Sequence, residues 1–149
     1  MAWWDKLGLG TRVVRATQEI ATEALFTIAV GKVLVTLLVG EVDVAINGTG
    51  ATVNTRLIST PTTATATDLC ANTNIDLYQI ADVVGITGIP TDTLIPATTH
   101  GSIPGMTTNG VIIPIGVIGL VTEAVDAGDM TWTLFYRPID NGASVVAAA

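Results

Sequence analysis

The chain has 149 residues, of which 49% are hydrophobic and 13% are charged, and it contains one histidine, His100, and one cysteine, Cys70. Acid–base catalysis near neutral pH, thiol chemistry and tight transition-metal sites draw mainly on His and Cys, so this composition argues against an enzyme, a cofactor site and a metal site. The formal net charge of −7 disfavours nucleic-acid binding, because phosphate contacts depend on clustered Lys and Arg.

The mean hydropathy of +0.59 is high, yet charged residues, Gly and Thr interrupt every stretch long enough to cross a membrane. We expect neither a membrane span nor a signal peptide, since no long apolar segment follows the first residues. Abundant apolar residues and few charges indicate that surface is hidden in an assembly; a monomer with a polar exterior of Thr, Asn and Gly is the alternative. The sequence therefore predicts a homo-oligomer, with a trimer favoured.

Residues 1–24 are interpreted as an N-terminal arm, basic in its first 15 residues and followed by an acidic body. Two adjacent tryptophans near its tip would anchor well in a groove of a partner, because Trp buries a large area at low entropy cost; covering the chain's own core is the alternative. Val13, Thr17, Ile20 and Ala24 recur at spacings of three or four, which predicts a short helix. The candidate partner-binding residues are Trp3, Trp4, Leu7, Arg12 and Arg15.

From residue 25 the pattern changes to period two, with apolar residues at nearly every even position up to residue 46. Gly31 and Lys32 separate two β-branched runs, so residues 25–30 and 33–39 are expected to pair as a hairpin with a two-residue turn. Gly40 is a candidate β-bulge. Glu41 and Asp43 then share one strand face, which we interpret as solvated and not as a paired-carboxylate site.

Further strands are expected over residues 52–59, 77–84, 111–113, 115–122, 130–139 and 144–146. Residues 85–110 are rich in Gly, Pro and Thr and predict a long ordered loop or a set of short strands that could contact a partner. His100 lies in this loop, where a hydrogen-bonding role is expected. Cys70 is interpreted as a small buried thiol, and Trp132 and Tyr136 as core residues.

Roughly eight short strands with hardly any helix predict an all-β fold. The expected architecture is an antiparallel β-barrel or a jelly-roll-like β-sandwich. It comprises a single β domain over residues 25–149, preceded by the arm of residues 1–24, which is expected to be partly helical.

Three stretches carry a resemblance to a known class of proteins. They are LFTIAVGKVLVT (residues 25–36) leading into VGEV (39–42), then ATDLCA (66–71), then WTLFYRPIDNGASV (132–145). In this order and spacing they resemble small β-rich structural proteins of tailed bacteriophage particles, and the match runs from about residue 25 to residue 146. Within that class, capsid decoration or cement proteins fit best.

This resemblance implies a virion protein on the capsid surface. Decoration proteins are small, acidic and β-structured, are commonly trimeric, and clamp neighbouring capsomers. The implied partners are the major capsid protein and further copies of this chain, without a cofactor, a small-molecule substrate, a nucleic acid or a membrane. The alternatives are a tail, fibre or head–tail connector subunit, and a carbohydrate-binding adhesion module, which would need clustered exposed aromatic residues and carboxylates.

Overall fold

The computed structural model describes residues 8–96, 101–123 and 128–149, and in these residues the chain is all-β, without a helix. This confirms the predicted fold class. The strands are β1 (Thr11–Glu19), β2 (Glu23–Ala29), β3 (Val33–Val44), β4 (Asn54–Pro61), β5 (Thr67–Asp68), β6 (Thr73–Asn74), β7 (Val83–Gly85), β8 (Val111–Ile113), β9 (Gly116–Thr122), β10 (Asp129–Pro138) and β11 (Ser144–Ala147).

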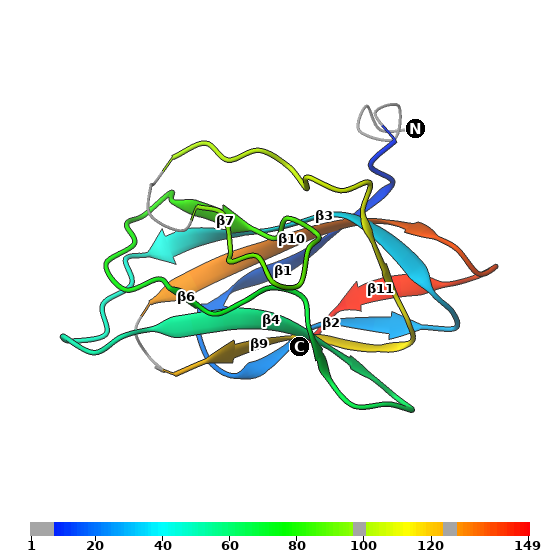
Figure 1. Cartoon of the computed structure of the whole chain (residues 1–149), viewed down its shortest axis with the longest axis horizontal. Coiled ribbons are helices and arrows are strands. Elements are labelled where there is room, and N and C mark those ends of the chain that lie inside the picture. The colour runs from blue at the N-terminus through cyan, green and yellow to red at the C-terminus, as the bar shows by residue number, and fades with distance from the viewer. Residues whose placement is uncertain (1–7, 97–100, 124–127) are drawn as a thin grey trace.

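The strands form two antiparallel sheets that stack as a sandwich (Figure 1). Sheet A has the order β1-β10-β3-β7, with β8 also paired to β3, and sheet B has the order β11-β2-β9-β4-β5, with β6 also paired to β4. Of the two predicted architectures the sandwich is therefore observed, and not a closed barrel. From β1 to β4, and again from β8 to β11, each strand lies in the sheet opposite to the strand before it.

The first strand corrects the helix predicted within residues 13–24. Residues 11–19 pair with β10, from Thr11 opposite Tyr136 to Glu19 opposite Asp129. The register shifts between Arg15 and Gln18, and this irregularity removes the strict alternation that would have marked a strand in the sequence. Residues 11–19 of the proposed arm are thus the edge strand of sheet A.

The link between β2 and β3 corrects the predicted hairpin, because these two strands lie in different sheets and do not pair. Val30 adopts a positive φ of 72°, and Lys32 N–H donates a hydrogen bond of 2.7 Å to Asp140 Oδ2. A Cβ on Gly31 would lie 2.4 Å from Asp140 Cβ. Contact with a turn more than 100 residues away therefore makes residues 30–32 a corner between the sheets.

Gly40 is not at a bulge, contrary to the prediction. It lies in register opposite Trp132, and the register shifts between β10 and β3 fall between Asp129 and Met130 and between Phe135 and Tyr136. A Cβ on Gly40 would lie 2.8 Å from Trp132 Cζ3. The glycine is needed here because the indole ring fills the space that a side chain would take.

The core lies between the sheets, where alternate side chains of each strand point inward. On β10 the inward residues Met130, Trp132, Leu134 and Tyr136 are buried, which confirms the core assignment of Trp132 and Tyr136. Phe26 and Leu57 of sheet B are fully buried as well. Since each such side chain contributes about 1.5–3 kcal/mol through burial, the two inner faces provide most of the stabilisation.

Residues 77–84 form mostly turns, and not the predicted strand, of which only β7 at the end is present. Leu77 and Ala81 have positive φ values of 67° and 73°, which a strand does not allow. Asp82 Oδ2 accepts a hydrogen bond from Gln79 N–H at 2.7 Å, so a local carboxylate stabilises the turn.

Residues 92–95 connect the open edges of the two sheets. On the side of sheet B, Ala71 N–H donates to Asp92 O at 2.7 Å and Leu94 N–H to Thr73 Oγ1 at 2.8 Å. On the side of sheet A, Gly85 and Ile95 exchange two backbone hydrogen bonds of 2.7 and 2.8 Å. The described part of the predicted loop is therefore ordered and closes one side of the sandwich.

Candidate functional site

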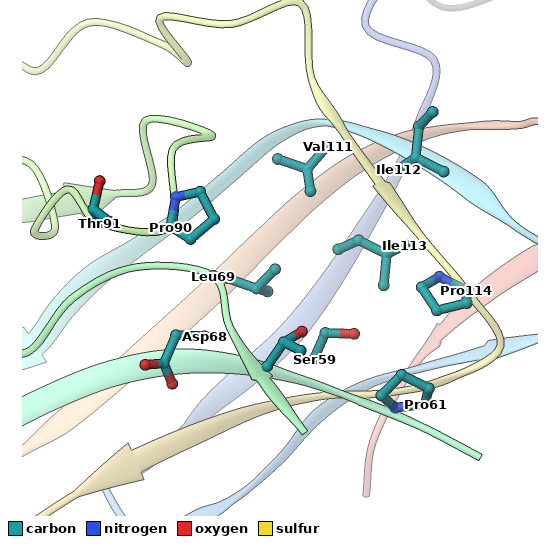
Figure 2. A pocket seen from close by; sticks show the side chains of 11 residues that line it. Ser59, Pro61, Asp68, Leu69, Pro90, Thr91, Val111, Ile112, Ile113 and Pro114 are labelled. Atoms are coloured by element: carbon teal, nitrogen blue, oxygen red, sulfur yellow. The ribbon is translucent and has the colours of Figure 1, made fainter. Parts of the chain in front are cut away.

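A hollow of about 470 Å³ lies beside this closed side, between the β4–β5 hairpin, the loop at residues 90–91 and strand β8. Figure 2 shows side chains from all three segments around it. We call it the edge hollow, because β5 and β8 border it and each is the last strand of its sheet on this side.

Prolines end the elements that form the edge hollow. β4 ends at Pro61, Pro114 follows β8 directly, and Pro90 lies in the loop opposite. Proline has no N–H to donate to a neighbouring strand, so Pro61 and Pro114 limit pairing on the side of the edge hollow, although Pro61 still lies opposite Gly116 of β9. The two sheet edges stay short, and a gap is left between them.

The wall of the edge hollow is mainly apolar. Ile113 and Leu69 are buried at its base, and Ile112, with 61% of its surface exposed, stands at its rim. Ser59 is buried and supplies a hydroxyl, while Thr67 and Thr91 add polar groups at the opening. This lining suits an apolar side chain whose backbone remains near polar groups.

Asp68 is the titratable residue among those that line the edge hollow. Its Oδ1 lies 3.1 Å from Arg56 Nε, and Arg56 Nη1 also donates to Asn72 Oδ1 at 3.3 Å. The carboxylate is thus paired with a fixed cation, and no second acid or base lines the hollow. The arrangement can bind a ligand, but it lacks the paired groups that acid–base or nucleophilic catalysis uses.

Strand edges give the edge hollow a second means of binding. Within the described residues, β5 pairs with β4 and β8 pairs with β3, and neither strand has a partner on its other side. A free edge presents backbone N–H and C=O groups to which an extended peptide can add as a further strand. The hollow would then receive a side chain of that peptide.

The two predicted partner-binding residues that the structure describes do not share one surface. Trp3, Trp4 and Leu7 lie outside the described residues. Arg12 and Arg15 both lie on β1 but face opposite sides, since Arg12 is exposed and Arg15 retains only 2% of its surface. Arg12 is therefore the described member of the set that a partner could contact.

Arg15 instead forms an ion pair inside the sandwich. Its Nη2 lies 2.8 Å from Glu23 Oε2 and donates a hydrogen bond of 2.5 Å to Gln18 Oε1. Glu23 begins β2 in sheet B, whereas Arg15 belongs to sheet A. The pair therefore links the two sheets at the β1–β2 corner.

Other residues with chemical potential have structural surroundings. Cys70 is buried as predicted, and burial raises the pKa of its thiol to about 11 although Leu57 N–H donates to its Sγ at 3.3 Å. Glu41 is exposed, while Asp43 Oδ2 accepts hydrogen bonds from the hydroxyls of Thr17 and Thr131. The role predicted for His100 concerns a residue outside the described ranges.

The described residues contain neither a cluster of metal ligands nor a helix that could cross a membrane. No group of three or more His, Cys, Asp or Glu in them is placed to hold a metal ion. No helix in this part of the chain has the length and apolar character needed to span a membrane.

The edge hollow had no marker in the sequence beyond its prolines, because residues 59–69, 90–91 and 111–114 meet only through the stacking of the sheets. Comparison with known proteins assigns it no role: no protein-family model, no curated protein and no solved structure matches the chain.

Proposed function

We propose that this chain is a virion structural protein of the capsid-decoration type, which binds the outer surface of a phage head and stabilises it by bridging capsid subunits. The observation that carries the proposal is the edge hollow, a binding surface between two free strand edges whose single carboxylate is already paired. The resemblance of residues 25–146 to phage structural proteins supplies the biological setting.

In this proposal an extended segment of the major capsid protein adds to the edge of β5 or β8. Its backbone forms strand-like hydrogen bonds, and one apolar side chain enters the hollow beside Leu69 and Ile113. A ligand that binds only the assembled lattice stabilises it by about 2.7 kcal/mol per site at a hundredfold excess over Kd. Because the site repeats over the shell, modest affinity suffices.

The adhesion-module alternative receives no support from the described aromatic residues. Phe26, Tyr78, Trp132 and Tyr136 are buried, and Phe135 is half-buried. A carbohydrate platform needs exposed aromatic rings that stack on sugars. No such group is present in the part of the chain that the structure describes.

The test is binding to phage heads, with a matched pair of variants. Ile112→Lys places a charge at the rim of the edge hollow, and Ile80→Lys makes the same change at a residue that is 67% exposed on the loop after β6. We expect Ile112→Lys to weaken head binding at least about tenfold, since an introduced charge loses its hydration on docking. Ile80→Lys should bind like the unaltered protein.

Mass spectrometry of separated heads and tails should find the protein in heads, and heads without it should rupture at a lower temperature. A protein found only in tails would replace the decoration proposal with the tail or connector alternative. Equal head binding by both variants would remove the edge hollow from the proposal.

A further inference from the structure

The outer face of sheet B is an exposed sheet surface of small and β-branched residues. One row across the strands consists of Val146, Thr27, Val117 and Thr60, and the next contains Ala24, Gly119 and Ile58. These side chains point away from the core, since the residues between them on each strand are buried. We call this surface the B face.

The B face carries few charges, and most of them are paired. Arg56 and Asp68 lie 3.1 Å apart as an ion pair, and Glu23, which also lines this face, is paired with Arg15. Glu123, just beyond the end of β9, accepts a hydrogen bond of 2.9 Å from Asn54 Nδ2. The whole chain has a formal net charge of −7. Two copies therefore repel one another in general, and a neutral face is where they can meet without bringing like charges together.

The middle of the B face is hollowed. Gly119 has no side chain to fill the space between Ala24 and Ile58, which leaves a depression of about 180 Å³. Val146, 56% exposed, stands out at the β11 side of the same face. A raised apolar residue and a shallow, mainly apolar depression on one face suit the packing of that face against a copy of itself.

The size of the B face sets the strength of such a contact. Five strands at a spacing of about 4.8 Å and a strand length of about 23 Å give a footprint of roughly 450 Å². Stable complexes bury about 800 Å² per partner, so this face alone supports a weak association.

We propose that the B face binds the B face of a second copy of this chain about a twofold axis. Sheets packed in this way lie about 10 Å apart, with the side chains of the two faces interdigitating. The inference does not depend on the capsid-decoration proposal, because it concerns the isolated protein, and the substituted residues Thr27 and Val146 do not line the edge hollow.

Sedimentation velocity of the isolated protein tests the contact. The sedimentation coefficient should rise between about 10 µM and about 1 mM, towards the value of two chains, as expected for a weak interface. Thr27→Lys should abolish the rise, since it puts a like charge opposite itself in each copy. The control is Thr133→Lys, the same change at a half-buried outward residue in the middle of sheet A, which should leave the rise unchanged.

Val146→Lys gives the same test at a more exposed position and should also abolish the rise, even if Thr27→Lys is poorly folded. The proposal is overturned if the unaltered protein stays monomeric at 1 mM or sediments as three chains. It also fails if Val146→Lys associates normally, or if Thr133→Lys and Val146→Lys weaken association equally. Head binding by a variant that no longer associates would leave the capsid-decoration proposal standing.

Discussion

The outer faces of the two sheets differ in what covers them. Over sheet A, Thr36 Oγ1 donates a hydrogen bond to Leu9 O, and a Cβ on Gly85 would lie 3.1 Å from Ile103 Cδ1. Over sheet B, Val146 and Ala24 stay exposed. Within the described residues, loops cover part of the outer face of sheet A and leave the outer face of sheet B exposed. Strands of similar composition thus acquire different roles through the segments that connect them.

The two faces can be compared only while the sheets stay joined. The substitution with the largest expected effect removes the ion pair that links the sheets at β1. Glu23→Ala removes the partner of Arg15, whose side chain is 2% exposed, and leaves a buried charge uncompensated. We expect a loss of about 3 kcal/mol in the free energy of unfolding, measured by urea denaturation. Combining Arg15→Met with Glu23→Leu should recover most of the loss. A cost below about 0.5 kcal/mol for Glu23→Ala would mean that the pair does not hold the sheets together.

A matched pair of glycine substitutions compares the faces directly. Gly85 and Gly119 each lie on an outer face without a positive φ, but a Cβ on Gly85 meets the Ile103 and Val39 side chains at 3.1 and 3.2 Å. Gly85→Ala should therefore cost about 1 kcal/mol through overpacking. Each Cβ would also meet a backbone oxygen at 3.3 Å, but a Cβ on Gly119 meets side chains only from 3.5 Å, so Gly119→Ala should change stability by no more than about 0.5 kcal/mol. Equal costs in thermal unfolding would contradict the difference in covering.

Alkylation of Cys70 measures how far the edge of sheet B opens. Because burial raises the pKa of this thiol to about 11, little thiolate exists at pH 8, and the reagent needs an opening of the fold to reach it. Iodoacetamide should react at least about a hundredfold more slowly than with a free cysteine, and 6 M urea should remove the protection. Fast labelling of the folded protein would show that the segment after β5 opens readily.

The smallest effect concerns the corner that joins β2 to β3. The Lys32 backbone N–H and its ammonium group, with Nζ 3.0 Å from Asp140 Oδ2, lower the pKa of Asp140 from its ordinary value of 3.8. The charged carboxylate therefore adds stability above pH 3.8, and this contribution is lost as the pH falls through the lower folded-state pKa. In Asp140→Asn the unfolding midpoint should depend less on pH below 4. Identical pH profiles for both proteins would exclude this role.

Period-two patterning predicted the strands where one face is buried, as in β3, β9 and β10, and thereby the all-β class. It did not predict β1, an edge strand that is exposed at most positions and has a register irregularity after Arg15. The pattern also could not assign strand partners. Gly31-Lys32 has the composition of a hairpin turn, but a hydrogen bond to Asp140, far along the chain, holds it as a corner between the sheets. The edge hollow was unpredictable for the same reason, because its walls meet only in the folded sandwich.

The pairing of β1 has a consequence while the protein is being synthesised. Within the described chain β1 pairs with β10 alone, and β10 is made more than 100 residues after β1. β1 thus stays unpaired while the residues between it and β10 are synthesised, and an unpaired strand can add to other chains. Its sequence, TRVVRATQE, contains two arginines, a glutamate and a glutamine, and such polar residues keep a waiting strand soluble. The same polar residues that kept β1 from being recognised as a strand in the sequence also hinder its addition to other chains until β10 is made.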